Sequence, residues 1–200
     1  MNIHLLEDRA CYIAIEKVAC SSIKYALGHH YGIASRKMPH VWPWRKLTPD
    51  RLLELRDEGV WAFAFIRNPF DRLVSCWAHK VARYRGKRAR CPLFRDLPTS
   101  TGFIDFVAWA TAQDPRRCNW HFRPQHRFLE HQGRPLTDCL YYFESLSGDW
   151  RMLQARFGWP DLPHRNATPH PHYRELFTAQ TRDMAERYYA RDLEIGGYEF

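Results

Sequence analysis

Three short apolar runs divide the chain and predict the strands of a sheet. They cover residues 10–15, 60–66 and 139–143. The run at 60–66, Val-Trp-Ala-Phe-Ala-Phe-Ile, is continuous rather than alternating, which is typical of a strand covered on both faces in a parallel sheet. We therefore expect one strand in each run.

Helical patterns separate and follow these runs. Thr48 followed by Pro49 predicts a helix start, with Thr as N-cap and Pro at the first helical position, and Gly59 predicts its end. Apolar residues recur at helical spacing at Phe70, Leu73, Val74, Trp77 and Val81. We expect further helices at residues 21–31, 102–112, 148–157 and 175–190, and loops at 36–47, 84–100 and 159–172. The alternation predicts an α/β fold, with a mainly parallel sheet flanked by helices in a single domain over residues 1–200.

The composition is that of a folded protein with a surplus of positive charge. Hydrophobic residues make up 45% of the 200 positions, and the net charge is +8. Such a surplus favours anionic cofactors, polyanions or acidic membrane surfaces as partners. The basic cluster at residues 83–90 is either a solvated loop or a patch for an anionic acceptor or partner.

The sequence does not show the pattern of a membrane anchor. The N-terminal residues do not follow the signal-peptide pattern, and no apolar run approaches the length of a membrane span. We therefore expect a cytoplasmic protein without a transmembrane segment, for which peripheral membrane contact stays open. The six cysteines lack zinc-site spacing and are expected to be free thiols. The oligomeric state is not readable from the sequence.

The segment after the first run is typical of an anion-binding turn. The apolar residues end in Lys17, small and hydroxyl residues follow from Ala19 to Ser22, and a helical pattern then begins. The first N–H groups of a helix have no intrahelical partner, and the helix dipole favours negative charge there. Lys17 adds a full positive charge, and Ser21 and Ser22 add hydroxyl donors. Cys20 is either a small residue of the loop or a nucleophile.

A second candidate anion site follows the second run. Arg67 stands at the strand end, Asn68-Pro69 forms a turn, and Ser75 lies about two turns into the next helix. A guanidinium can bind a phosphate through two parallel hydrogen bonds. The alternatives are an Arg67–Asp71 ion pair and an ordinary helix serine. Because Lys17 and Arg67 both follow strand ends, the pattern favours two anion sites on one edge of the sheet.

Taken together, five segments resemble the sulfotransferase superfamily, in particular its carbohydrate sulfotransferase branch. They are Lys17-Val-Ala-Cys-Ser-Ser22, Arg67-Asn-Pro-Phe-Asp-Arg-Leu-Val-Ser75, Asn119-Trp-His-Phe-Arg-Pro-Gln125, Tyr142-Phe-Glu-Ser-Leu146 and Tyr189-Ala-Arg-Asp-Leu-Glu-Ile-Gly-Gly-Tyr198. The resemblance spans nearly the whole chain. It implies a P-loop-like α/β fold. It also implies transfer of a sulfuryl group from 3′-phosphoadenosine 5′-phosphosulfate (PAPS) to a hydroxyl of a carbohydrate or glycoconjugate. The desulfated nucleotide, 3′-phosphoadenosine 5′-phosphate (PAP), is the second product.

The resemblance also implies roles for individual residues. Lys17 would contact the phosphosulfate, and the main chain from Ala19 through Cys20 to Ser22, with the Ser21 and Ser22 hydroxyls, would hold the 5′-phosphate. Arg67 and Ser75 would hold the 3′-phosphate. His121 is the candidate base, with a structural or substrate-contact role as its alternative. A sulfuryl group carries less charge than a terminal phosphate, so no metal is required.

Two departures from the family pattern bear on this assignment. Glu16 stands where the family often has Pro, and its carboxylate would oppose phosphosulfate binding unless it points away, so we expect it to pair with a basic residue. Glu144 is the competing candidate for the base. Trp42 and Trp44 either line an acceptor groove or pack the loop.

Two other function classes compete with this interpretation. A basic nucleic-acid-binding module would use the cluster at residues 83–90. A kinase-like enzyme would use ATP, although the full Walker A pattern is absent. Neither explains Lys17, Arg67 and Ser75 together, so we expect no nucleic-acid partner.

Overall fold

A computed structural model describes residues 2–35, 38–85, 94, 97–98, 100–165 and 168–200. The chain forms two compact units, each built from two segments. The first, here called the sheet unit, comprises Met1–Ile66 and Arg127–Ala167. The second, the helical unit, comprises Arg67–His126 and Thr168–Phe200. The single domain over residues 1–200 stays a prediction.

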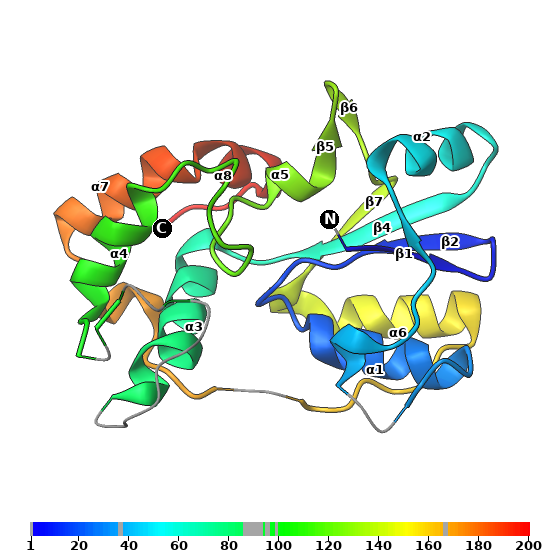
Figure 1. Cartoon of the computed structure of the whole chain (residues 1–200), viewed down its shortest axis with the longest axis horizontal. Coiled ribbons are helices and arrows are strands. Elements are labelled where there is room, and N and C mark those ends of the chain that lie inside the picture. The colour runs from blue at the N-terminus through cyan, green and yellow to red at the C-terminus, as the bar shows by residue number, and fades with distance from the viewer. Residues whose placement is uncertain (1, 36–37, 86–93, 95–96, 99, 166–167) are drawn as a thin grey trace. The chain divides into compact units, whose positions relative to one another are not determined.

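The sheet unit is organised around a five-stranded sheet with the order β3-β1-β2-β4-β7 (Figure 1). Its strands are β1 (Ile3–Leu6), β2 (Ala10–Ile13), β3 (Lys46–Leu47), β4 (Trp61–Ile66) and β7 (Cys139–Tyr142). β2, β4 and β7 are parallel neighbours, whereas β1 pairs antiparallel with both β2 and β3. The three parallel strands therefore end at the same edge of the sheet.

Helices cover both faces of this sheet. α1 (Cys20–His30) and α6 (Leu146–Phe157) lie on one side and α2 (Pro49–Asp57) on the other (Figure 1). Aromatic rings fill the layer under α6, where Phe65 packs against Trp150 and Phe63 against Trp159. The remaining elements of this part are η1 (Pro39–Val41), η4 (Phe143–Ser145) and the hairpin of β5 (Glu130–His131) and β6 (Arg134–Pro135); α5 (His126–Leu129) connects the two units along the chain.

The helical unit has its own apolar core. Its elements are α3 (Pro69–Lys80), η2 (Ala82–Tyr84), α4 (Phe103–Thr111), η5 (Tyr173–Glu175), α7 (Ala179–Tyr188) and α8 (Ala190–Gly196). α4 packs against α7 and α3. The buried cluster is rich in aromatic side chains, including Phe70, Phe106, Phe122 and Tyr189. Two residues separate the end of β4 from the start of α3, which carries Ser75.

The predicted α/β fold with parallel strands and flanking helices is confirmed. Thr48 caps α2, because its hydroxyl accepts a hydrogen bond from the Arg51 N–H at 3.2 Å. Among the described residues, no helix has both the length and the hydropathy needed to cross a bilayer. Cys11, Cys20, Cys76, Cys118 and Cys139 are free thiols, as expected, and Cys91 lies outside the described residues.

Two expectations are corrected by the structure. The helix expected over about 175–190 is present but shorter: Thr178 caps α7, which covers Ala179–Tyr188, and a separate helix, α8, follows after Tyr189. β1 and β3 were not predicted. β1 joins β2 through a turn in which Glu7 and Asp8 both have positive φ, a conformation that Gly or Asn usually signals. Most of the loop expected at 84–100 lies outside the described residues.

Candidate functional site

Residues 16–22 comprise the end of the connection from β2 and the first three residues of α1, and they are here called the Lys17 loop. Lys17 and Ala19 have positive φ values of 70° and 48°, which are uncommon for residues other than glycine. α1 begins at Cys20 with no acidic residue in its first turn, and no side chain of the described residues caps it. The first N–H groups of α1 therefore point out of the helix with the positive end of its dipole, the arrangement that binds anions.

The hydroxyls of the loop have different surroundings. Ser21 Oγ lies 2.9 Å from Nε2 of His40, a residue of η1. Ser22 is buried, and its Oγ accepts a hydrogen bond from the backbone N–H of Arg165 at 3.3 Å. The Ser22 backbone N–H donates to the Ala19 carbonyl at 2.9 Å. Ser21 is thus half-buried, whereas Ser22 is buried.

Glu16 contacts two side chains of the same unit, Cys20 and His40. The expectation that it points away from a bound phosphosulfate stays a prediction. One carboxylate oxygen accepts from the Cys20 thiol at 3.3 Å, and the other lies 3.8 Å from Nδ1 of His40. Burial raises the pKa of Cys20 to about 12, and the negative charge of Glu16 acts in the same direction. Cys20 is therefore a protonated hydrogen-bond donor rather than a nucleophile.

Arg67 begins the helical unit directly after β4 and is 7% exposed. Its guanidinium donates twice to Asp71, at 2.8 Å from Nε and 2.6 Å from one terminal nitrogen. The ion pair considered as an alternative from the sequence is therefore present. Gln125 holds the Arg67 backbone through both its N–H and its carbonyl, at 3.0 and 2.8 Å. Arg67 has a fixed backbone and a neutralising partner.

Ser75 is buried in α3, four residues beyond Asp71. Residues four apart share one face of a helix. Asn68 caps this helix, because its side-chain oxygen accepts from the Phe70 N–H at 2.9 Å. The Asn-Pro turn thus sets the start of α3 and places Asp71 and Ser75 on the same face.

His121 lies in a segment of the helical unit that is held by many hydrogen bonds. Its Nδ1 lies 2.8 Å from the side-chain oxygen of Asn119, which also accepts from the His121 backbone N–H at 3.0 Å. Because an amide oxygen only accepts, Nδ1 carries the proton and Nε2 keeps the lone pair. The buried Arg72 donates to the carbonyls of Trp120 and Arg123 on either side. His121 is thus oriented with a basic nitrogen, as a general base must be.

Glu144, the competing base, is exposed in η4 directly after β7. Trp42 and Trp44 are buried rather than open to a groove. The Trp44 indole N–H donates to the Pro39 carbonyl at 2.8 Å, and the two indoles stack with 6.3 Å between centroids. The packed-loop alternative is therefore correct for these two residues.

The sequence analysis missed His40 and Asp192. His40 lies in a loop without a readable pattern, nineteen residues from Ser21. Asp192 accepts from the backbone N–H groups of Gln125 and His126 at 2.6 and 2.8 Å. No spacing rule connects either residue with its partner, so only the fold brings these contacts together.

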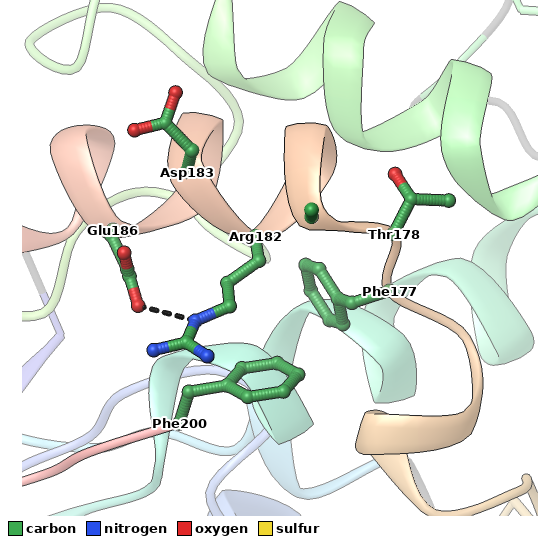
Figure 2. Close-up of a pocket in the computed structure, with 7 residues that line it drawn as sticks. Phe177, Thr178, Arg182, Asp183, Glu186 and Phe200 are labelled. Carbon is green, nitrogen blue, oxygen red and sulfur yellow. Dashed lines mark hydrogen bonds and ion pairs between the residues drawn. The ribbon is translucent and has the colours of Figure 1, made fainter.

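The helical unit also has a pocket of about 390 Å³ between α7 and the C-terminal residue (Figure 2). Arg182 lies over the Phe200 ring and pairs with Glu186 at 2.7 Å. The pocket is lined by Phe177, Thr178, Ala179, Arg182, Asp183, Glu186 and Phe200. It contains none of the predicted site residues.

Comparisons with known proteins agree with the resemblance seen in the sequence. The model of the sulfotransferase family matches residues 7–199. Carbohydrate sulfotransferase 14 of Mus musculus and that of Homo sapiens are each 25% identical over 169 residues, which cover 74% of this chain and 42% of the relative. The chain thus spans less than half the length of these relatives. No solved structure gives a significant match.

Proposed function

The chain belongs to the sulfotransferase family, and from this premise we propose that it transfers a sulfuryl group from PAPS to a hydroxyl of a carbohydrate or glycoconjugate. The Lys17 loop is the observation that carries the proposal. It combines a lysine, two positive-φ residues and an uncapped helix start without acidic residues. These features favour a bound anion at the start of α1.

Each unit has its own set of proposed donor contacts. In the sheet unit, Lys17 interacts with the phosphosulfate, and the main chain from Ala19 to Ser21 binds the 5′-phosphate together with the Ser21 and Ser22 hydroxyls. In the helical unit, Arg67 and Ser75 bind the 3′-phosphate. The Arg67 guanidinium also donates to Asp71, which holds it in place beside the start of α3.

The chemistry follows from these positions. In sulfuryl transfer, the bond from sulfur to the acceptor oxygen forms while the bond to the phosphate oxygen breaks, and PAP leaves. Charge grows on the departing phosphate oxygen, where the Lys17 ammonium stabilises it. His121 takes the proton of the acceptor hydroxyl at Nε2. No step calls for a metal.

The acceptor class rests on the relatives, both of which are named carbohydrate sulfotransferases. The cytoplasmic location stays a prediction.

The first test is thermal unfolding of the protein with PAP. Saturation at about 100 times the dissociation constant stabilises a folded protein by about 2.7 kcal/mol, which corresponds to a shift of about 5–10 °C at this chain length. ATP with magnesium is the control nucleotide. No PAP effect, or a larger effect of ATP with magnesium, contradicts the proposal and favours the kinase-like alternative. Steeply salt-dependent binding of DNA or RNA without a PAP response favours the nucleic-acid-binding alternative.

The second test separates catalysis from binding at Lys17. We expect Lys17→Ala to lower kcat with labelled PAPS at least a hundredfold, because its charge acts on the leaving oxygen, while the affinity for PAP falls less than tenfold. Lys46→Ala, at an exposed lysine of β3 in the same unit, is the matched control. An unchanged kcat removes Lys17 from the mechanism.

A further inference from the structure

Ser21, His40 and Lys24 form a continuous chain of contacts beside the start of α1. Ser21 Oγ lies 2.9 Å from Nε2 of His40, and Nδ1 of the same ring lies 3.3 Å from the Lys24 Nζ. Lys24 is 1% exposed. A lysine buried to this degree requires partners inside the protein. His40 thus connects a buried ammonium with a hydroxyl on the Lys17 loop.

The ammonium selects the tautomer of the imidazole. An ammonium has three donors and no lone pair, so the Lys24 contact makes Nδ1 of His40 the acceptor. Nε2 then carries the ring proton and donates it to Ser21 Oγ. Glu16 does not reverse this order, because its oxygen is 3.8 Å from Nδ1, beyond hydrogen-bond distance.

The consequence concerns the proton of Ser21. A hydroxyl oxygen that accepts from Nε2–H uses one lone pair for that bond, and its own O–H is then available to another acceptor. Ser21 stands at the second position of α1, where the helix favours an anion. The acceptor that matches this position is an anionic phosphate oxygen.

We propose that His40 is a positioning residue that turns the Ser21 hydroxyl proton toward the 5′-phosphate of the donor nucleotide, with Lys24 fixing the tautomer of its ring. The inference rests on the proposed function and deepens it. His40 touches neither the sulfuryl group nor the acceptor in this role, and it acts through Ser21.

Metal binding is the main alternative role for the same residues. Glu16, Cys20 and His40 offer ligand atoms that lie within 4.8 Å of one another. A metal ion there would need the Nδ1 lone pair of His40, which faces the Lys24 ammonium at 3.3 Å. It would also add positive charge beside a buried ammonium and require a thiolate from Cys20. The contacts therefore favour the hydrogen-bond chain.

The test is a double-mutant cycle on PAP binding, measured by titration calorimetry. We expect Ser21→Ala and His40→Ala each to weaken PAP about tenfold, as loss of a hydrogen bond to a charged group does. The double variant should be no weaker than Ser21→Ala alone. His40→Asn, whose amide can still donate, should recover part of the affinity. His30→Ala, at an exposed histidine of α1, is the matched control and should bind like the wild type.

A second nucleotide distinguishes positioning from a general disturbance of the fold. Adenosine 3′-monophosphate lacks the 5′-phosphate, so its affinity should change less than twofold in His40→Ala. Three outcomes overturn the inference and leave the proposed function standing. They are equal losses of affinity for both nucleotides in His40→Ala, additive losses of PAP affinity in the double-mutant cycle, and a lower kcat with unchanged PAP affinity. Absence of PAP binding by the wild-type protein overturns the proposed function and this inference together.

Discussion

His4 is a histidine on β1 that the fold keeps away from both water and hydrogen-bond partners. Its side chain is 0% exposed, and within the described residues neither ring nitrogen has a hydrogen-bond partner. The ring packs against Trp44 at 4.8 Å between centroids. Burial lowers the pKa of His4 to about 2, and the positive charges of Lys24 and Lys46 act in the same direction. His4 is therefore neutral in the folded protein and costs stability.

We expect His4→Phe to stabilise the protein, and more so in acid. The substitution removes two unsatisfied buried nitrogens, which cost about 1–3 kcal/mol. In the wild type, the unfolded chain binds a proton below its pKa of about 6.5 and the folded chain does not, so stability falls by about 1.4 kcal/mol per pH unit from there toward the folded value. Urea unfolding at about pH 7.5 and 5.5 measures both effects.

The quantity to compare is the difference in free energy of unfolding between the variant and the wild type at each pH, since other groups titrate as well. His30→Phe, at an exposed histidine, should leave that difference near zero at both pH values. If the stabilisation by His4→Phe is not larger at about pH 5.5 than at about pH 7.5, the result contradicts a neutral buried His4.

At the scale of elements, the chain used ordinary local signals to start its helices. Thr48-Pro49 and Asn68-Pro69 each place a capping side chain before a proline, and α2 and α3 begin there. α1 is different, because it begins after Ala19 in the left-handed region without a side-chain cap. Among the described residues, α4, α6 and α8 also lack a side-chain cap, but only α1 among these four follows a left-handed N-cap residue and a lysine. A donor phosphate at the start of α1 can satisfy its first N–H groups.

Gly28 of α1 and Gly148 of α6 form a matched pair for testing element packing. A Cβ at position 28 would lie 2.2 Å from the Trp42 ring, whereas a Cβ at position 148 would meet nothing within 4 Å. Both changes to Ala raise helix propensity by up to about 1 kcal/mol. We expect Gly148→Ala to stabilise, and Gly28→Ala to destabilise by about 1–3 kcal/mol through overpacking against a buried indole.

Chemical unfolding of the two variants measures the sign of each change. Equal stabilisation by both would mean that Trp42 moves freely and that the loop over α1 is not packed as described.

At the scale of the whole molecule, each of the two units is built from two segments that alternate along the chain. The sheet unit takes Met1–Ile66 and Arg127–Ala167, and the helical unit takes the two remaining segments. Contacts between distant segments therefore hold each unit together. In the helical unit, Asp192 of α8 is buried and binds the main chain at Gln125 and His126, with a further contact to the His126 ring at 2.9 Å.

We expect Asp192→Ala to destabilise the protein by about 3 kcal/mol or more, because it leaves the buried Gln125 N–H and the half-buried His126 N–H without their acceptor. Asp183→Ala removes an exposed partner of Arg187 and should cost less than about 1 kcal/mol. Thermal or denaturant unfolding of both variants gives the comparison. Similar small losses would show that the Asp192 contacts do not join the two segments of this unit.

Much of the fold could be predicted because its signals are local. Apolar runs 10–15, 60–66 and 139–143 match β2, β4 and β7. β2 and β4 are almost wholly buried, and a strand buried on both faces must be apolar throughout. β1 was not predicted because its turn has Glu7 and Asp8 at positive φ, a conformation that their residue types do not indicate. Among the site residues, Lys17, Arg67, Ser75 and His121 stand beside recognisable turns or motifs, whereas their assigned roles stay predictions.

The amino-acid order alone determined the family, the parallel strands and the loop at the start of α1, because short-range patterning and motif spacing encode them. Only the tertiary structure decided that Arg67 pairs with Asp71, that Glu16 turns to Cys20 and His40, and that His40 meets Ser21. These outcomes depend on side-chain distances between elements that loops bring together. Hydrophobic periodicity specifies which face of an element is buried, but it does not specify which polar group of another element lies opposite.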